Sequence, residues 1–358
     1  MSAWVREALW ARLRDAGYVA DEIPARGEAN APWYVRLMLG IAGWIGASFL
    51  LGFVGAAFAL LIKNAGAEFV VGAGACAVAV LIFRAAPKND FVAQFGLAIS
   101  LSGQVLMAHA DSQWFGQSAT TIAVFLAFQQ ALLFVLVPNF VHRLWASWSA
   151  ALAATFAMLA SGLGPFAPAV TSAAFLWVAL SEFRLARHGA LVGPAVVGLA
   201  LAVIQLSLIP GDLLGGLIDR QGQLFVLGTT GFWLGRAASV AVLLWAAVML
   251  VRREGVGGAS SQGRIALAGA LILGLVSLKA PGVGPAVAIL VVGFANADRV
   301  LAGLGIFALL GYLSHYYYSL QATLLEKSGL LVAAGIALII VRFAMQCWWP
   351  KDREAGHA

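Results

Sequence analysis

The stretch VRLMLGIAGWIGASFLLGFVGAAFALLI, residues 35–62, decides the fold class of this chain. After Arg36 it contains no charged residue, and it exceeds the about 20 residues that an α-helix needs to cross a hydrocarbon core roughly 30 Å thick. Backbone amides in lipid must be hydrogen-bonded within their own segment, so this run predicts a transmembrane helix.

Comparable apolar runs fill the rest of the chain. Hydrophobic residues make up 62% of the sequence, charged residues 11%, and the mean hydropathy is +0.91, whereas soluble domains are about half apolar and about a quarter charged. We therefore predict an all-α, polytopic transmembrane helical bundle of about 12 spans over residues 35–348, followed by a cytoplasmic tail over 349–358. The predicted spans are 35–62, 69–83, 91–108, 120–137, 144–161, 165–180, 190–209, 232–251, 265–278, 285–295, 300–313 and 330–345.

The N-terminal segment, residues 1–34, carries Val5, Leu9 and Leu13 at helical spacing beside several arginines. This pattern predicts a short amphipathic helix on the cytoplasmic face, which lies at the lipid headgroups or, as the alternative, docks a partner. The segment lacks the apolar core and small-residue cleavage site of a signal peptide, so we expect the first span to remain as a membrane anchor.

Lysine and arginine gather in alternate loops, as they do on the cytoplasmic side of membrane proteins. The bias is roughly three to one and predicts that both termini are cytoplasmic. The basic residues predicted inside are Arg6, Arg12, Arg14, Arg26, Arg36, Arg84, Lys88, Arg143, Arg184, Arg187, Arg252, Arg253, Arg264, Arg299, Arg342, Lys351 and Arg353; those predicted outside are Lys63, Arg220, Arg236, Lys279 and Lys327.

Several classes of function are disfavoured. The net charge of +6 is scattered at the edges of apolar runs rather than gathered into a patch, which argues against nucleic-acid binding. Cys76 and Cys347 have no partner spacing that predicts a disulfide or a zinc site. No HExxH, GxSxG or P-loop motif is present, and we expect no cofactor.

Glutamines are the main polar groups inside the predicted spans, at Gln94, Gln104, Gln129, Gln130 and Gln205. Hydrogen bonds between helices are the favoured interpretation, and a substrate path is the alternative. The acidic residues Asp90, Glu182, Asp298 and Glu326 all fall at predicted span ends. A carboxylate in mid-span is typical of proton-coupled transporters, so their absence there argues against that class.

Two polar stretches on the outer side are predicted to be loops. One holds His109, Asp111, Gln113 and Trp114, and the other covers residues 211–220. His109 with Asp111 is a hypothetical metal or proton site, but a solvated loop is the favoured interpretation.

The richest polar stretch lies near the C-terminus. Asn296 and Asp298 precede a predicted helix and are expected to cap it, with Arg299 reaching lipid phosphates of the inner leaflet. Aromatic and charged residues then gather at the outer face, where they predict either an aromatic belt or a recognition surface for a lipid headgroup, a sugar or a periplasmic partner. The residues of this outer group are His315, Tyr316, Tyr317, Tyr318, Glu326 and Lys327.

This C-terminal stretch resembles the signature of a bacterial membrane family, the domain-of-unknown-function family numbered 4401. The matching residues are Phe294-Ala295-Asn296, Arg299-Val300-Leu301, the run from Tyr312 to Tyr318, and Leu325 with Lys327-Ser328, although His315 stands where another large ring is expected. The resemblance implies an inner-membrane component encoded beside other membrane proteins. It implies no activity, ligand or catalytic residue.

We therefore expect a non-catalytic inner-membrane subunit that binds a partner in the membrane or periplasm. The alternative is a transporter of a small or lipidic substrate, with the glutamines lining its path and residues 281–296 forming its hinge. A third hypothesis is an enzyme that uses His109 with Asp111, or His315 with Glu326.

Overall fold

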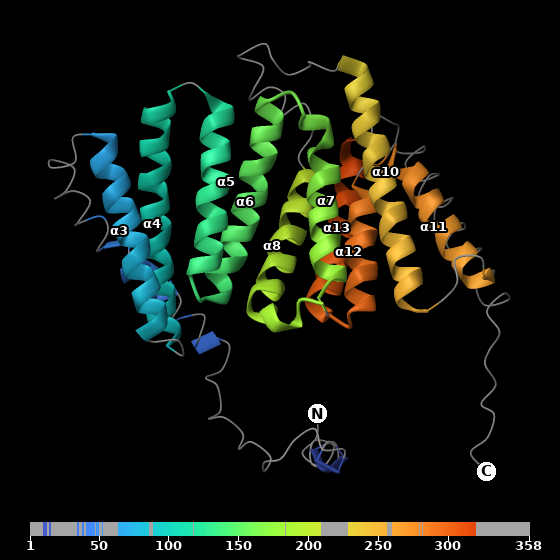
Figure 1. The fold of residues 1–358 in the computed structure, drawn as a ribbon, viewed down its shortest axis with the longest axis horizontal. Helices are drawn as coiled ribbons and strands as arrows, with labels where there is room; N and C mark the ends of the chain where they lie inside the picture. Colours follow the sequence, from blue (N-terminus) through green and yellow to red (C-terminus); the bar gives the residue numbers. More distant parts are fainter. Residues whose placement is uncertain are drawn as a thin grey trace. The chain divides into compact units, whose positions relative to one another are not determined.

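The computed structural model describes residues 10–12, 14–15, 34–35, 38, 41–46, 48–49, 52, 64–85, 89–116, 118–182, 184–208, 228–255, 260–278, 280 and 282–319 (Figure 1). Every regular element among them is a helix, which confirms the predicted all-α class. The helices are α3 (Ala65–Ala85), α4 (Asp90–Phe115), α5 (Ala119–Leu136), α6 (Phe140–Ala160), α7 (Ala167–Leu180), α8 (Gly189–Leu208), α10 (Gly228–Arg253), α11 (Ser261–Ser277), α12 (Val283–Ala295) and α13 (Arg299–Ser319), with short 3-10 turns η1 (Gly164–Phe166) and η2 (Ala186–His188).

Within these described residues, 5 helices are long and apolar enough to cross a membrane. They are α3, residues 91–115 of α4, α5, α8 and residues 230–253 of α10. Shorter apolar helices cover 164–180, 261–277, 283–295 and 299–315. Several long apolar helices in one chain indicate a membrane protein. Of the predicted N-terminal helix only residues 10–12 and 14–15 are described, and these are helical; the predicted span at 330–345 and the tail lie outside the described residues.

Polar caps place the helix starts ahead of the predicted apolar runs. Asn139 Oδ1 accepts the backbone N–H of His142 at 3.0 Å, so α6 begins at Phe140 rather than at residue 144. Ser260 Oγ accepts the backbone N–H of Gly263 at 3.1 Å, and α11 begins at Ser261 rather than at residue 265. These side chains satisfy N–H groups that the first helical turn leaves free.

The predicted outer loop from His109 to Trp114 is wrong, because α4 continues as a helix to Phe115. Exposed Gln113 Nε2 lies 3.1 Å from His109 Nδ1, one helical turn away, and such pairs stabilise a helix. Asp111 is fully buried. The polar residues that suggested a loop therefore form the last turns of α4, which has one buried side and one exposed side there.

The chain divides into two compact units, Met1–Leu106 and Met107–Ala358, with the boundary inside α4. In the first unit, α3 packs closely on α4 through small residues. A methyl group at Gly103 would lie 2.5 Å from the carbonyl oxygen of Gly72 and 3.0 Å from Cys76 Sγ. Cys76 Sγ in turn donates to the Ser100 carbonyl at 3.5 Å. Glycine at this crossing lets the two backbones meet.

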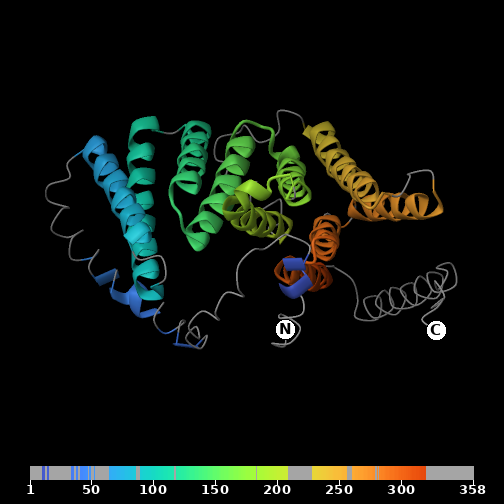
Figure 2. The same cartoon turned by 60° about the horizontal axis from the view of Figure 1, so that its bottom comes forward.

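The second unit holds α5 to α13 as neighbouring helices of alternating direction (Figures 1 and 2). Its core lies where α7, α8, α12 and α13 meet, around the fully buried side chains of Phe175, Leu176, Ile289 and Leu301. These residues come from segments far apart in the chain, so the core forms only when α7, α8, α12 and α13 have packed together.

A proline and an arginine join α8 to α5 and α6. Pro194 lies inside α8 and has no N–H to donate to the carbonyl four residues earlier, which belongs to Ala190. Arg143 Nη1 donates to that carbonyl at 3.0 Å, and Arg143 Nε donates to the Phe134 carbonyl near the end of α5 at 3.2 Å. The side chain therefore supplies the donor that the proline removes.

The α12–α13 hairpin depends on glycines, as the crossing of α3 and α4 does. A methyl group at Gly305 would lie 2.6 Å from Leu290 Cα, and one at Gly293 would lie 2.5 Å from the Ala302 nitrogen. Both neighbours are backbone atoms, which cannot rotate away. The two helices can keep this separation only with glycine at both positions.

We expect Gly305→Ala to destabilise the protein by roughly 1–3 kcal/mol, the usual cost of overpacking, because α12 and α13 must separate. Gly303→Ala is the matched control on the same helix, since a methyl group there meets nothing within 4 Å. Thermal unfolding in detergent measures both variants. Equal melting temperatures for the two variants would contradict the close packing.

Candidate functional site

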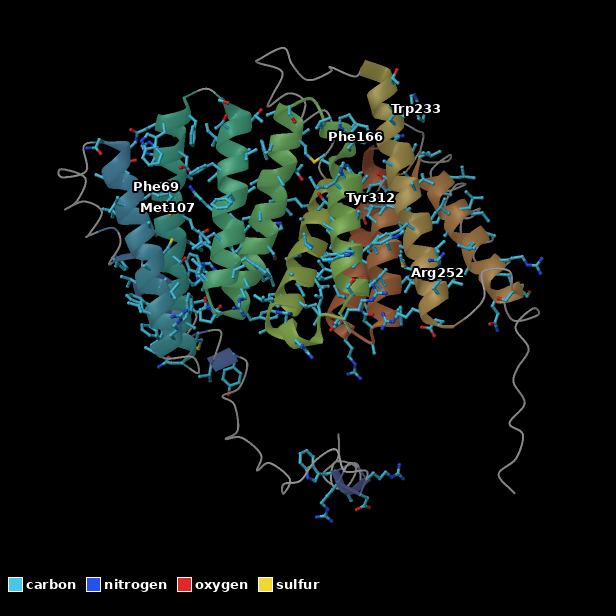
Figure 3. All side chains as sticks on the ribbon, viewed as in Figure 1. Phe69, Met107, Phe166, Trp233, Arg252 and Tyr312 are labelled. Atoms are coloured by element: carbon cyan, nitrogen blue, oxygen red, sulfur yellow. The ribbon has the colours of Figure 1, made fainter. Side chains whose placement is uncertain are left out.

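Arginines gather at one end of the second unit, which we call the arginine end. Because the helices alternate in direction, this end collects the starts of α6, α8, α11 and α13 and the ends of α7, α10 and α12. Figure 3 labels Arg252 towards this end of α10 and Trp233 towards the other. The arginines of the arginine end are Arg143, Arg184, Arg187, Arg252, Arg253, Arg264 and Arg299.

Asn296 lies at the centre of a polar cluster at the arginine end. Its side-chain Nδ2 donates to the Ala179 carbonyl at 2.9 Å and to Glu182 Oε2 at 3.2 Å. Its Oδ1 accepts from Arg253 Nη1 at 2.6 Å. One amide side chain thereby joins the ends of α7, α10 and α12.

The predicted N-cap role on α13 is confirmed for Asp298 and is wrong for Asn296. Asp298 Oδ1 accepts the backbone N–H groups of Val300 and Leu301 at 2.8 and 3.2 Å, so Asp298 caps α13 as predicted. Asn296 instead follows α12 as its C-cap residue and bridges to other helices. Arg299 is exposed at the first turn of α13. No local pattern indicates Glu182 and Arg253 as partners of Asn296, because they lie 114 and 43 residues away.

The aromatic candidates lie at the opposite end of α13. His315 is exposed, Tyr318 is 81% exposed, and the Tyr317 and Tyr318 rings meet edge to face with centroids 5.5 Å apart. Tyr316 is helical, and Glu326 and Lys327 lie outside the described residues, so the predicted pairing of His315 with Glu326 lies outside them too. Arg299 and His315 are about 24 Å apart along the helix axis, so the two groups of candidates form separate sites.

The glutamines are used in contacts between and within helices. Gln94 Oε1 accepts from Trp44 Nε1 at 3.0 Å, and Gln104 Nε2 donates to Ser100 Oγ at 3.2 Å. Gln104, Gln129 and Gln130 are all buried, with exposed fractions of 6–8%. Gln104 belongs to the first unit and the other two to the second.

Gln129 has a partner that the sequence analysis missed. Its Nε2 lies 2.6 Å from Oδ2 of Asp111, whose exposed fraction is 0%. The second carboxyl oxygen of Asp111, Oδ1, is buried and has no hydrogen-bond partner in the described part of the chain. Asp111 also lies inside the apolar segment 91–115 of α4, so an acidic residue does fall within a candidate span.

His109 and Asp111 do not form the predicted pair. Residues two apart on a helix point about 200° apart, and His109 is exposed whereas Asp111 is buried. Helical spacing was the signal that could have identified Asp111, because Ser100, Gln104, Met107 and Asp111 recur at intervals of four and three residues and are all buried.

Within the described residues, no group of three or more His, Cys, Asp or Glu side chains lies close enough together to hold a metal ion. The crevice between α8, α12 and α13, lined by Ser207, Pro285 and Tyr312 among others, is too narrow for a water molecule.

Comparison with known proteins identifies the family. The model of the domain of unknown function DUF4401 matches residues 32–347. The chain belongs to the DUF4401 family. No curated protein and no solved structure matches it. The predicted resemblance, drawn from the last part of the chain, thus extends over nearly the whole length of this DUF4401 member.

We expect Asn296→Ala to lower the stability of this DUF4401 member, because the partly buried hydrogen bonds to the Ala179 carbonyl on α7 and from Arg253 on α10 are both lost. Each lost hydrogen bond costs about 1–3 kcal/mol when its partner stays buried. Glu182→Gln is the control, since Glu182 is exposed and glutamine keeps an acceptor oxygen. Urea or thermal unfolding in detergent compares them; a loss no larger for Asn296→Ala than for Glu182→Gln would contradict the bridging role.

Proposed function

We propose that this chain is a non-catalytic integral subunit of the bacterial inner membrane that binds a membrane or periplasmic partner through the outer end of α13. The observation that carries the proposal is the exposure of His315 and Tyr318 at the end of the helix opposite the arginine end. Both termini would lie in the cytoplasm, and the complete chain would cross the membrane about 12 times.

The orientation is supported by the distribution of charge. Lysine and arginine favour the cytoplasmic side of membrane proteins. The arginine end would therefore face the cytoplasm, which directs His315 and Tyr318 to the periplasmic face. Arg236 lies towards that face, where its guanidinium carbon is 4.2 Å from the centre of the Phe232 ring and its Nη1 donates to the Leu278 carbonyl. Aromatic and carbonyl contacts of this kind hold an arginine at the headgroup level.

A partner-binding surface at the end of α13 is supported by the chemistry of its side chains. Tyrosine combines a large apolar ring with a hydroxyl group, and it is enriched at protein interfaces. An aromatic belt in the lipid headgroups uses the same chemistry. We propose a protein partner, and crosslinking from position 318 distinguishes a protein from lipid.

The transport alternative has less support. Gln94 and Gln104 bond to Trp44 and Ser100, and Gln129 bonds to Asp111. A side chain that lines a substrate path is expected to face a cavity instead. The predicted hinge around residues 281–296 contains Gly282, where an added methyl group would overlap the Tyr312 ring, so Gly282 is closely packed.

We expect single cysteines to react according to this topology. In a variant without Cys76 and Cys347, a cysteine at Tyr318 should react with a membrane-impermeant maleimide on intact cells. A cysteine at the exposed position Arg252 should react only after the membrane is permeabilised. Reaction of Arg252→Cys on intact cells would contradict the orientation.

We expect a photo-crosslinking amino acid at position 318 to form an adduct with another protein in native membranes. Phe307 is the matched control, because it is 67% exposed and lies eleven residues, about three turns, earlier on the same face of α13. Position 307 should label lipid, because it lies deeper in the membrane. Mass spectrometry identifies the adducts, and lipid adducts alone at position 318 would identify an aromatic belt and overturn the proposal.

A further inference from the structure

We propose that Asp111 and Gln129 form a proton-binding site, in which the Asp111 carboxyl group holds a proton and shares a hydrogen bond with the Gln129 amide. The two side chains converge from neighbouring helices of opposite direction, α4 and α5, with 2.6 Å between the amide and the carboxyl group. This site is separate from the surface at the end of α13, so its failure would leave the proposed function untouched.

The geometry places the pair away from water. Side chains on a helix lean towards its N-terminus, so Asp111 leans from the end of α4 into the apolar segment, and Gln129 leans towards it from α5. Gln129 follows the first residue of α5 by ten positions, about 15 Å along the axis. Figure 3 labels Met107, one turn before Asp111 on α4. Asp111 is 0% exposed, and Gln129 is 6% exposed.

The side chains around Asp111 supply too few hydrogen-bond donors to stabilise a negative charge on its carboxyl group. An ionised carboxylate has about four acceptor positions and is normally buried only with a cation or several donors. Here Gln129 is the partner of Oδ2, and Oδ1 has no partner within the described residues. A proton removes the charge and requires no further donor at Oδ1.

Charged groups on the adjacent helices do not supply the missing cation. On α4 itself, His109 is exposed and points to a different side of the helix from Asp111. The segment that forms α5 contains no titratable residue. On α6, His142 and Arg143 lie in the first turn, at the arginine end, where Arg143 donates to Phe134 and Ala190.

A metal cation fits the site less well than a proton. Sodium, calcium and magnesium are held by several oxygen ligands. Asp111 and the Gln129 amide provide two groups, and no larger cluster of acidic or histidine side chains exists among the described residues. Rotation of the Gln129 amide by 180° exchanges its oxygen and nitrogen, so its oxygen can accept the carboxyl proton. A separation of 2.6 Å is typical of such an O–H···O hydrogen bond.

Infrared spectroscopy of the full chain in detergent tests the proposal. At a pH of about 8, exposed Asp and Glu side chains are ionised, since their ordinary pKa values are about 4. We expect the wild type to show the carbonyl stretch of a protonated carboxyl group, with a small shift in heavy water. Asp111→Asn should abolish this band, and Asp298→Asn, which keeps an N-cap side chain, should retain it.

A wild type without the band, or a band that persists in Asp111→Asn, would overturn the proposal, because Asp111 would then be ionised or bind a cation. If Asp111→Asn does not yield folded protein, Gln129→Leu gives a second test. Loss of the amide removes the hydrogen bond from the carboxyl group, so the same band should move to higher frequency. An unmoved band in that variant would assign the proton to another residue.

Discussion

In the apolar surroundings of the helices, a buried polar group is stabilised by a partner within the protein or, for a carboxyl group, by loss of its charge. Water satisfies such groups at the surface of a soluble domain, but it is absent from the interior of a membrane. Even the exposed first turn of α8 follows this pattern, because the Ala190 carbonyl, which Pro194 leaves without an N–H donor, accepts a hydrogen bond from Arg143. The Asp111–Gln129 and Asn296 contacts follow the same requirement, although they lie at different ends of the molecule.

This requirement can be met only where the helices approach closely, and small residues permit that approach. Gly103 against Gly72, Gly198 against Ser147, and Gly305 against Leu290 each leave no room for a methyl group. Lipid chains are as apolar as leucine, so helix association depends on contact and on hydrogen bonding more than on removal of apolar surface from water. The glycines therefore carry much of the specificity of the packing.

Charge and aromatic character divide the second unit along its length. Arginines collect at one end, where Arg253 bonds to Asn296, and exposed tyrosine and histidine side chains stand at the other end of α13. The side chains between these ends are mostly apolar or used in packing. Binding at the outer end and proton uptake at Asp111 would thus use different parts of the fold, and either role can exist without the other.

Local sequence patterns predicted the helical membrane class, most of the described helix positions and the cap at Asp298, because length, hydropathy and capping are properties of neighbouring residues. The motif near the C-terminus predicted the family. The sequence also favoured hydrogen bonds between helices for the glutamines, and Gln94 and Gln129 make such contacts with Trp44 and Asp111. The hydrogen bonds of Asn296 with Glu182 and Arg253 were found only in the folded structure. The structure also showed that His109 and Asp111 point to different sides of α4. It also placed Asp111 inside a helix beside Gln129. Such contacts join segments that are distant in the chain, so no local pattern predicts them. A polar residue near the end of a span also has the same neighbours in sequence whether it meets water or another helix.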